Sequence, residues 1–315
     1  MSAPFRYRRL GYVALNVSDI DKTSRFATEV FGLDQVAEAA DGTRFFRSGQ
    51  AHHDVVVAPA GKPGFVRSAW ELERDAELDI AFDHFRGAGM QPQWMSDKEC
   101  AGLRLQRAFR VTDAVAGATW EYYAEMTYLS TPRTNTLTTF QGGKHFGMAV
   151  PDCKAMTGHA IQQLGFLVSD YFEGNVLSLM RAWPNPNHHS IAFVESPGAG
   201  PRFHHLAFMV QTIDDIGRLL NRVKRYGVQV QWGIGRHPTS GSIHLYIYDP
   251  DHIVWEYTLG MEQFAEQGAR PPRRFTITPE EFDLWGAVPD SSHAADMPPV
   301  LTAAPHAAEL RSVMA

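Results

Sequence analysis

An internal repeat constrains the fold of this chain most strongly, because two similar halves are expected to fold into two similar units. YVALNVSDIDKTSRFATEVFGL (12–33) and HFGMAVPDCKAMTGHAIQQLGF (145–166) both read as an apolar strand, a polar turn and an amphipathic helix. Further along, HHDVVVAPAG (52–61) resembles HHSIAFVESPG (188–198). Both pairs keep the same order, at a spacing of about 135 residues.

Two further landmarks recur between the halves in the same order. LDIAF (78–82) resembles the middle of FHHLAFMV (203–210), and TWEYYAEM (119–126) resembles VWEYTLGM (254–261). Each half divides again, because the third and fourth quarters both open with a strand followed by a helix, in HFGMAVPDCKAMTGHAIQQLGF and HHLAFMVQTIDDIGRLLNRVKRYG. We therefore expect each half to contain two copies of a smaller unit.

The fourth quarter of the chain shows that unit most clearly. One stripe of a helix is formed by Ile216, Leu219, Leu220, Val223 and Tyr226. Thr212 with Asp215 resembles a capping box, and Gly227 is a natural helix end. Three β-branched and aromatic runs follow. We predict an α+β fold of four βαβββ modules, paired into two domains that are each an incomplete mixed β-barrel with outer helices.

The domain limits follow from the repeat. We expect an N-terminal domain without a metal site over residues 1–130, a Thr- and Gly-rich linker over 131–142 and a catalytic domain over 143–262. Residues 263–315 lie beyond the repeat as a C-terminal extension. Within it, EEFDLWG (280–286) reads as a short docked helix, and the small-residue and Pro-rich remainder reads as loosely ordered.

Composition excludes several classes of protein. Of 315 residues, 44% are hydrophobic and 20% are charged, which is typical of a soluble globular chain. No run approaches the roughly 18 to 20 apolar residues of a membrane helix, and we expect no membrane partner. A net charge of −6 without a basic stripe argues against nucleic acid. Two cysteines, and no signal peptide at the N-terminus, favour the cytoplasm.

Histidine is the residue type that suggests chemistry. Nine of the fourteen histidines lie between His145 and His252. His145 and His205 open the first strands of the third and fourth units, and Glu256 lies on the last strand, across a turn from Tyr246. Two imidazoles and one carboxylate from separate strands match the facial triad of a non-haem iron site. The first half offers Val13 and Asp79 at the expected histidine positions and keeps only Glu121, so we predict metal in the second half alone.

These motifs resemble those of the type I extradiol catechol dioxygenases of the vicinal oxygen chelate superfamily, over residues 8 to 262. The quoted segments are HFGMAVPD, FHHLAFMVQTIDDIG and GRHPTSGSIHLYIYDPDHIVWEY. The resemblance implies that His145, His205 and Glu256 hold Fe(II), with Mn(II) as an alternative. It also implies that His189 assists dioxygen and moves a proton, and that His237 and Tyr246 hydrogen-bond the substrate oxygens.

The activity implied by this resemblance is meta cleavage of a substituted catechol by O2 in aromatic catabolism, with both oxygen atoms incorporated into the product. Relatives of this kind are commonly homo-oligomers. The ring size stays open, although Trp183 and its neighbouring prolines favour a substituted single ring. The alternatives are a hydroquinone-cleaving or glyoxalase-like metalloenzyme of the same superfamily and a non-catalytic small-molecule-binding protein.

Each candidate also has a purely structural interpretation. His145 and His205 could be hydrogen-bonded core residues, Glu256 a solvated strand residue and Tyr246 a packing residue. His189 has a counterpart, His53, in the half without a site. We expect His244 to be partly exposed, and we assign His84, His159, His293 and His306 to the surface.

Overall fold

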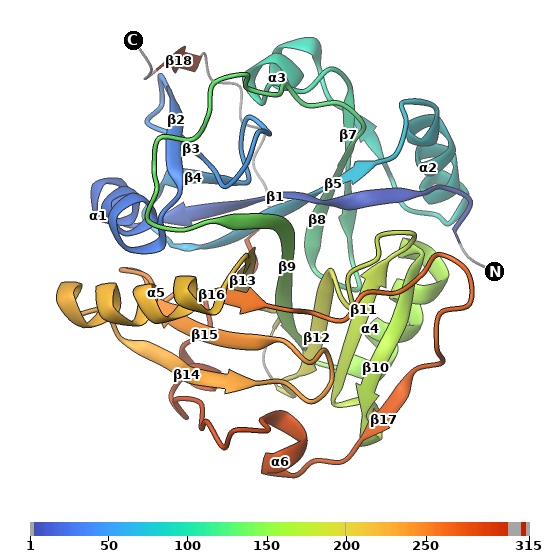
Figure 1. Ribbon diagram of the computed structural model, residues 1–315. Coiled ribbons are helices and arrows are strands. Elements are labelled where there is room, and N and C mark those ends of the chain that lie inside the picture. The colour runs from blue at the N-terminus through green and yellow to red at the C-terminus, as the bar shows by residue number, and fades with distance from the viewer. Residues whose placement is uncertain (1–2, 199, 302–309, 313–315) are drawn as a thin grey trace.

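The computed structural model describes residues 3–198, 200–301 and 310–312. The predicted α+β class is confirmed, because two mixed sheets curl without closing into barrels. Figure 1 shows the N-terminal sheet in blue to teal above the C-terminal sheet in green to orange, with helices around the outside. His306 lies outside the described residues.

The N-terminal half, joined by β18 from the C-terminal extension, forms one sheet with the strand order β18-β2-β3-β4-β1-β5-β8-β7-β6. Its strands are β1 (Tyr7–Val17), β2 (Asp34–Ala39), β3 (Arg44–Arg47), β4 (Val55–Pro59), β5 (Gly64–Leu72), β6 (Gln93–Trp94), β7 (Ala108–Asp113), β8 (Ala118–Tyr123) and β18 (Leu310–Ser312). Its helices are α1 (Ile20–Arg25), the π-helical segment η1 (Phe26–Phe31), α2 (Ala76–Gly87) and α3 (Asp97–Gly102).

The C-terminal half forms a second sheet with the order β14-β15-β16-β13-β9-β12-β11-β10-β17. Its strands are β9 (Phe140–Val150), β10 (Phe166–Phe172), β11 (Leu177–Ala182), β12 (Ile191–Glu195), β13 (Arg202–Val210), β14 (Val230–Arg236), β15 (Ile243–Tyr248), β16 (Val254–Leu259) and β17 (Arg273–Phe275). Its helices are α4 (Cys153–His159), η2 (Ala160–Leu164), η3 (Glu173–Asn175), α5 (Ile213–Tyr226), α6 (Pro279–Phe282) and α7 (His293–Asp296).

The repeat is visible in how the helices begin and end. Asp19 caps α1 and Asp152 caps α4, each by accepting a backbone N–H three residues on. The helical segments that follow end at Gly32 and Gly165, with φ of 91° and 75°. The predicted capping box at α5 and its glycine end at Gly227 are confirmed.

Strand register corrects one detail of the alignment between the halves. Tyr12 pairs with Ala69 on β5, as His145 pairs with Ala207 on β13. Tyr12, and not Val13, is therefore the counterpart of His145. Because side chains alternate along a strand, this shift of one residue moves the side chain to the opposite face.

The predicted counterpart of His205 is also wrong. Asp79 lies in α2, and its carboxylate accepts hydrogen bonds from Arg107 on the surface. Ala69 pairs with Glu121 as Ala207 pairs with Glu256. The residue two positions before Ala69 is Arg67, which therefore occupies the place of His205.

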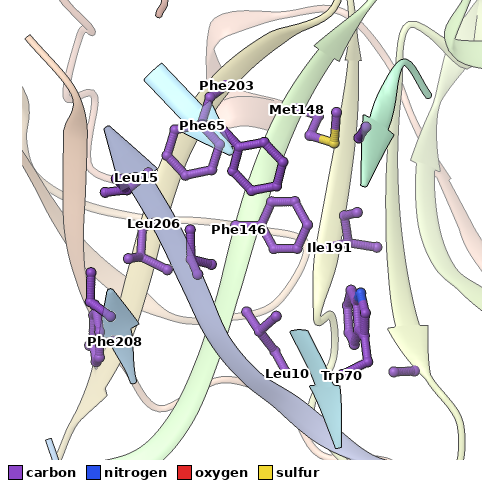
Figure 2. Close-up of a cluster of buried hydrophobic side chains, with 14 of the residues drawn as sticks. Leu10, Leu15, Phe65, Trp70, Phe146, Met148, Ile191, Phe203, Leu206 and Phe208 are labelled. Carbon is purple, nitrogen blue, oxygen red and sulfur yellow. The ribbon is translucent and has the colours of Figure 1, made fainter. Parts of the chain in front are cut away.

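A single hydrophobic core joins the two halves. Phe65 from the N-terminal sheet stacks on Phe203 and Phe146 from the C-terminal sheet, with ring centroids 5.0 and 5.7 Å apart. Figure 2 shows these rings together between strands of both halves, with Trp70 nearby. The strands β9 and β13, which carry His145 and His205, are thus packed against the N-terminal half.

The C-terminal extension is more ordered than expected over the residues described. β17 adds to the second sheet beside β10, and Leu301 donates a backbone hydrogen bond to Phe65. His293, which we assigned to the surface, is buried in the short helix α7. The predicted short helix in EEFDLWG corresponds to α6.

Cys100 and Cys153 are both buried free thiols. Within residues 3–198, 200–301 and 310–312, none of the helices is long and apolar enough to span a membrane.

The shared core predicts that Phe65→Ala lowers the free energy of unfolding by about 3 to 5 kcal/mol, because a fully buried ring leaves a cavity between the halves. Urea denaturation followed by fluorescence measures this loss. Val288→Ala is the control, since Val288 is 82% exposed and should change the free energy by less than about 0.5 kcal/mol. Equal effects of both substitutions would show that the halves do not depend on this contact.

Candidate metal centre

Three adjacent strands place the predicted ligands on one face. Ala207 on β13 pairs with His145 on one side and with Glu256 on the other. His205 precedes Ala207 by two residues, so its side chain points to the same face of the sheet. The structure thus brings the three residues together although they are far apart in the chain.

The ligand atoms lie close to a common point. His145 Nε2 is 3.0 Å from Glu256 Oε2, and His205 Nε2 is 3.5 Å from the same oxygen. One donor atom from each residue lies within 4.8 Å of the other two. All three side chains are buried, and this spacing leaves room for one ion between them.

The polar atoms of this group fit a bound cation. Both carboxylate oxygens of Glu256 and Nε2 of His205 are buried without a hydrogen-bond partner in the described chain. An unpaired buried carboxylate is strongly unfavourable unless a positive charge compensates it. Two imidazoles and one carboxylate on one side of an ion form the donor set that suits Fe(II), Mn(II) or Zn(II).

His189, His237 and Tyr246 surround this group. The His189 ring lies beside the His145 ring, with centroids 4.2 Å apart. Tyr246 pairs across the sheet with Glu256 and packs edge-on against His205. The hydroxyl of Tyr246 is 3.1 Å from His237 Nε2. All six predicted site residues are therefore brought together, while their individual roles stay predictions.

Burial determines the charge of these side chains. It lowers the pKa of His205 and that of His189 well below the usual value for histidine, and the neighbouring histidines lower both further. Burial, together with Glu256, raises the pKa of the Tyr246 hydroxyl well above its usual value. At neutral pH His205 and His189 are uncharged, and neutral imidazole is the form that binds a metal ion.

A cavity of about 140 Å³ opens beside the group. His189, His205, His237 and Tyr246 contribute to its wall. Its apolar lining comes from Phe172, Leu177, Leu179, Ala192, Val194, Trp232 and Phe282. Trp183, which we expected near the substrate, is not among the lining residues and packs against Arg6 instead.

Two pocket residues, Phe172 and Phe282, and the burial of His244 escaped prediction. Phe282 comes from α6 in the C-terminal extension, and Phe172 ends β10 and stacks on it at 4.5 Å. His244, which we expected to be partly exposed, is fully buried, and its Nε2 is 2.9 Å from Asp283 Oδ2. The strand parity of His244 with Tyr246 was a usable signal for its inward direction, whereas no sequence motif marks Phe172.

Arginine fills the corresponding place in the N-terminal half. Glu121, the counterpart of Glu256, accepts a hydrogen bond from Arg110 Nε at 2.7 Å and lies 3.2 Å from Arg67 Nε. Tyr12 also donates its hydroxyl to Glu121. Guanidinium groups neutralise this carboxylate, so a metal ion is not needed here.

Sequence comparison identifies related proteins. Residues 9–122 and 143–257 match the Glyoxalase/Bleomycin resistance protein/Dioxygenase superfamily. The chain is 24% identical over 280 residues to 1,2-dihydroxynaphthalene dioxygenase of Sphingobium xenophagum, which covers 82% of this chain and 90% of that protein. It is 27% identical over 257 residues to biphenyl-2,3-diol 1,2-dioxygenase of Pseudomonas sp. (strain KKS102), with 78% and 87% covered.

Structure comparison gives the same fold. Homoprotocatechuate 2,3-dioxygenase from Brevibacterium fuscum, solved with 3,4-dihydroxyphenylacetate, superposes with a TM-score of 0.85 at 22% identity, covering 95% of each chain. Homologues and structural neighbours are thus extradiol ring-cleaving dioxygenases. Among the other relatives, one is named iron-dependent and another manganese-dependent.

The geometry predicts that His145→Ala abolishes metal retention, because the remaining two donors cannot hold the ion firmly. Elemental analysis after anaerobic loading with Fe(II) and gel filtration measures the bound iron. His189→Ala is the matched control, since it removes a neighbouring imidazole that is not in the ligand group and should leave about one iron per chain. Full iron in the first variant would contradict the ligand assignment.

Proposed function

We propose that this chain, which belongs to the Glyoxalase/Bleomycin resistance protein/Dioxygenase superfamily, is a non-haem Fe(II)-dependent extradiol dioxygenase. It would cleave a substituted catechol beside the diol and place both atoms of O2 in the product. The observation that carries this proposal is the buried group of His145, His205 and Glu256, of which His205 also lines a cavity. Fe(II) is the proposed ion, and Mn(II) would fit the same donors.

When bound, the ion would supply neighbouring open positions at which the diol and O2 can react. The chain's residues would position the substrate and move protons. His237 and Tyr246, which contact each other through Nε2 and the hydroxyl, lie where they can hydrogen-bond a catechol oxygen. His189 lines the same cavity next to His145, and it can exchange a proton there.

The pocket favours a single ring with an apolar substituent. An apolar cavity of roughly 150 Å³ accommodates one benzene ring, and this cavity measures about 140 Å³. Of the described residues that line it, none is Lys or Arg, and Glu281 adds a carboxylate at its edge. A carboxylate on the substrate would therefore lack a counter-ion and meet a like charge.

The alternative functions lack comparable support. A glyoxalase-like site would use a second carboxylate, but Asp79 is bonded to Arg107, and Glu121 is neutralised by Arg67 and Arg110. A binding protein would not require the hydrogen-bonding residues beside the ligand group. The cytoplasmic location and the homo-oligomeric state remain predictions.

Activity gives the direct test. Protein loaded anaerobically with Fe(II) should take up O2 with 3-methylcatechol and form a yellow ring-opened product, whereas chelated protein should remain inactive. His189→Ala should retain iron and lower kcat by about 100-fold, because a positioned proton-transfer group is lost. No O2 uptake by iron-loaded protein over a broad panel of catechols would refute the proposal.

Substrate charge provides a separate prediction. The kcat/KM for 3-methylcatechol should exceed that for 3,4-dihydroxyphenylacetate by at least about tenfold, because the pocket offers no cation to the carboxylate. Glu281→Gln should lower the ratio of the two kcat/KM values, because it removes the like charge from the pocket. Glu280→Gln, at the neighbouring position, is the control and should leave the ratio unchanged. A preference for the carboxylated catechol would contradict the assignment of the pocket.

A further inference from the structure

His189, His188 and Asp170 form a chain of hydrogen-bonded side chains. His189 Nδ1 is 3.1 Å from His188 Nδ1, and His188 Nε2 is 2.8 Å from Asp170 Oδ2. His188 and Asp170 are fully buried, and His189 is buried as well. In each of these contacts one atom must donate a proton and the other must accept it. The protonation of one residue therefore determines that of the next.

Asp170 is held as a carboxylate by two arginines of the C-terminal extension. Arg270 Nη1 and the backbone N–H of Arg273 donate to its Oδ1, each at 2.8 Å, and Arg273 Nη2 donates to Oδ2 at 2.7 Å. Burial alone would raise the pKa of Asp170, but hydrogen bonds from His188, Arg273 and Arg270 outweigh it and lower the pKa. A carboxylate only accepts hydrogen bonds, so His188 Nε2 must carry a proton.

The same arginines argue against a second metal ion here. Asp170, His188 and Glu262 bring donor atoms within 4.8 Å of one another. However, Arg270 also donates to both oxygens of Glu262, at 2.8 and 2.6 Å. Guanidinium groups therefore already neutralise both carboxylates, and the cluster is an ion-pair network.

The second ring nitrogen of His188, Nδ1, carries no proton. Burial lowers the pKa of His188 in spite of the hydrogen bond to Asp170, so its ring is neutral and carries one proton, on Nε2. Its Nδ1 is then an acceptor, and the donor that faces it must be Nδ1–H of His189. This leaves the lone pair of His189 on Nε2.

We infer that His188 and Asp170 are positioning residues that fix His189 in its Nδ1–H tautomer, so that Nε2 of His189 meets the substrate as a proton acceptor. This inference rests on the proposed function. A catechol hydroxyl would give its proton to Nε2, which forms an N–H bond as the O–H bond breaks, and His189 would become an imidazolium. The Nδ1–H bond to His188 stays in place throughout this transfer.

The N-terminal half shows that the carboxylate is not needed for the fold. Its pair His52 and His53 has the same Nδ1 to Nδ1 distance of 3.1 Å. Ala37 pairs with Phe45 on the neighbouring strand, and Asp170 pairs with Leu179 in the same way. The pairing of Phe45 and of Leu179 with the next strand of each sheet keeps the same register between the halves. Ala37 therefore occupies the place of Asp170. The acidic partner is present only in the half with the ligand group.

The tautomer can be measured without catalysis. We would label the full-length, iron-free protein with ring-¹⁵N histidine and assign the His189 nitrogens by their loss in His189→Gln. The expected result is an unprotonated Nε2 and a protonated Nδ1. In His188→Leu, which removes the acceptor, Nε2 of His189 should gain proton occupancy. His188→Asn keeps an acceptor next to His189 and should retain the wild-type pattern.

Steady-state kinetics supplies the second measurement. His188→Leu should lower kcat about tenfold with KM little changed and iron retained, as expected for loss of a supporting hydrogen bond. His52→Leu is the matched control in the other half and should stay within about twofold of wild type.

Three results would overturn the inference: a protonated Nε2 in the wild-type protein, an unchanged tautomer in His188→Leu, or equal kcat losses in both leucine variants. If His188→Leu does not fold, the wild-type spectrum still decides. The expected tautomer in a protein without O2 uptake would refute the proposed function alone.

Discussion

The buried carboxylate of Glu256 is the constraint on which the site depends. Its two oxygens face two imidazoles in the interior, and none of the described side chains hydrogen-bonds to them. Such a group destabilises a folded chain unless a cation lies beside it. The sheet register fixes this arrangement, since Ala207 has His145 and Glu256 as its partners on either side. The same buried surroundings keep His205 neutral and available as a ligand.

The two halves compensate the charge of a buried glutamate in different ways. Glu121 stands where Glu256 stands, but Arg67 and Arg110 replace His205 and Tyr246 around it. In the N-terminal half, fixed guanidinium groups compensate the negative charge of Glu121. In the C-terminal half, a bound metal ion can compensate that of Glu256. The N-terminal half nevertheless supports the site, because Phe65 packs behind the strands that carry His145 and His205. The C-terminal extension contributes at the opposite side, through Phe282 in the pocket wall and through the arginines on Asp170.

Much of this arrangement could be predicted from the sequence. The repeat and the helix caps indicated the modules, and the motifs indicated six residues that the fold brings together. The prediction of Val13 as the counterpart of His145 failed because Val13 lies one residue beyond Tyr12, and a shift of one residue along a strand turns the side chain to the other face. The prediction of Asp79 failed because LDIAF has the apolar character of a strand but belongs to the helix α2. The partner of His244 could not be found, since Asp283 lies in the extension and only the folded chain brings them together.

Anomalous diffraction at the iron edge, on crystals loaded anaerobically with Fe(II), would show where the chain binds iron. We expect one strong peak, about 2 to 2.3 Å from Nε2 of His145, Nε2 of His205 and an oxygen of Glu256. We expect no peak at Glu121 or at Asp170, where arginines supply the charge. An iron peak at another group of residues, or none at Glu256, would show that these three residues do not form the iron site.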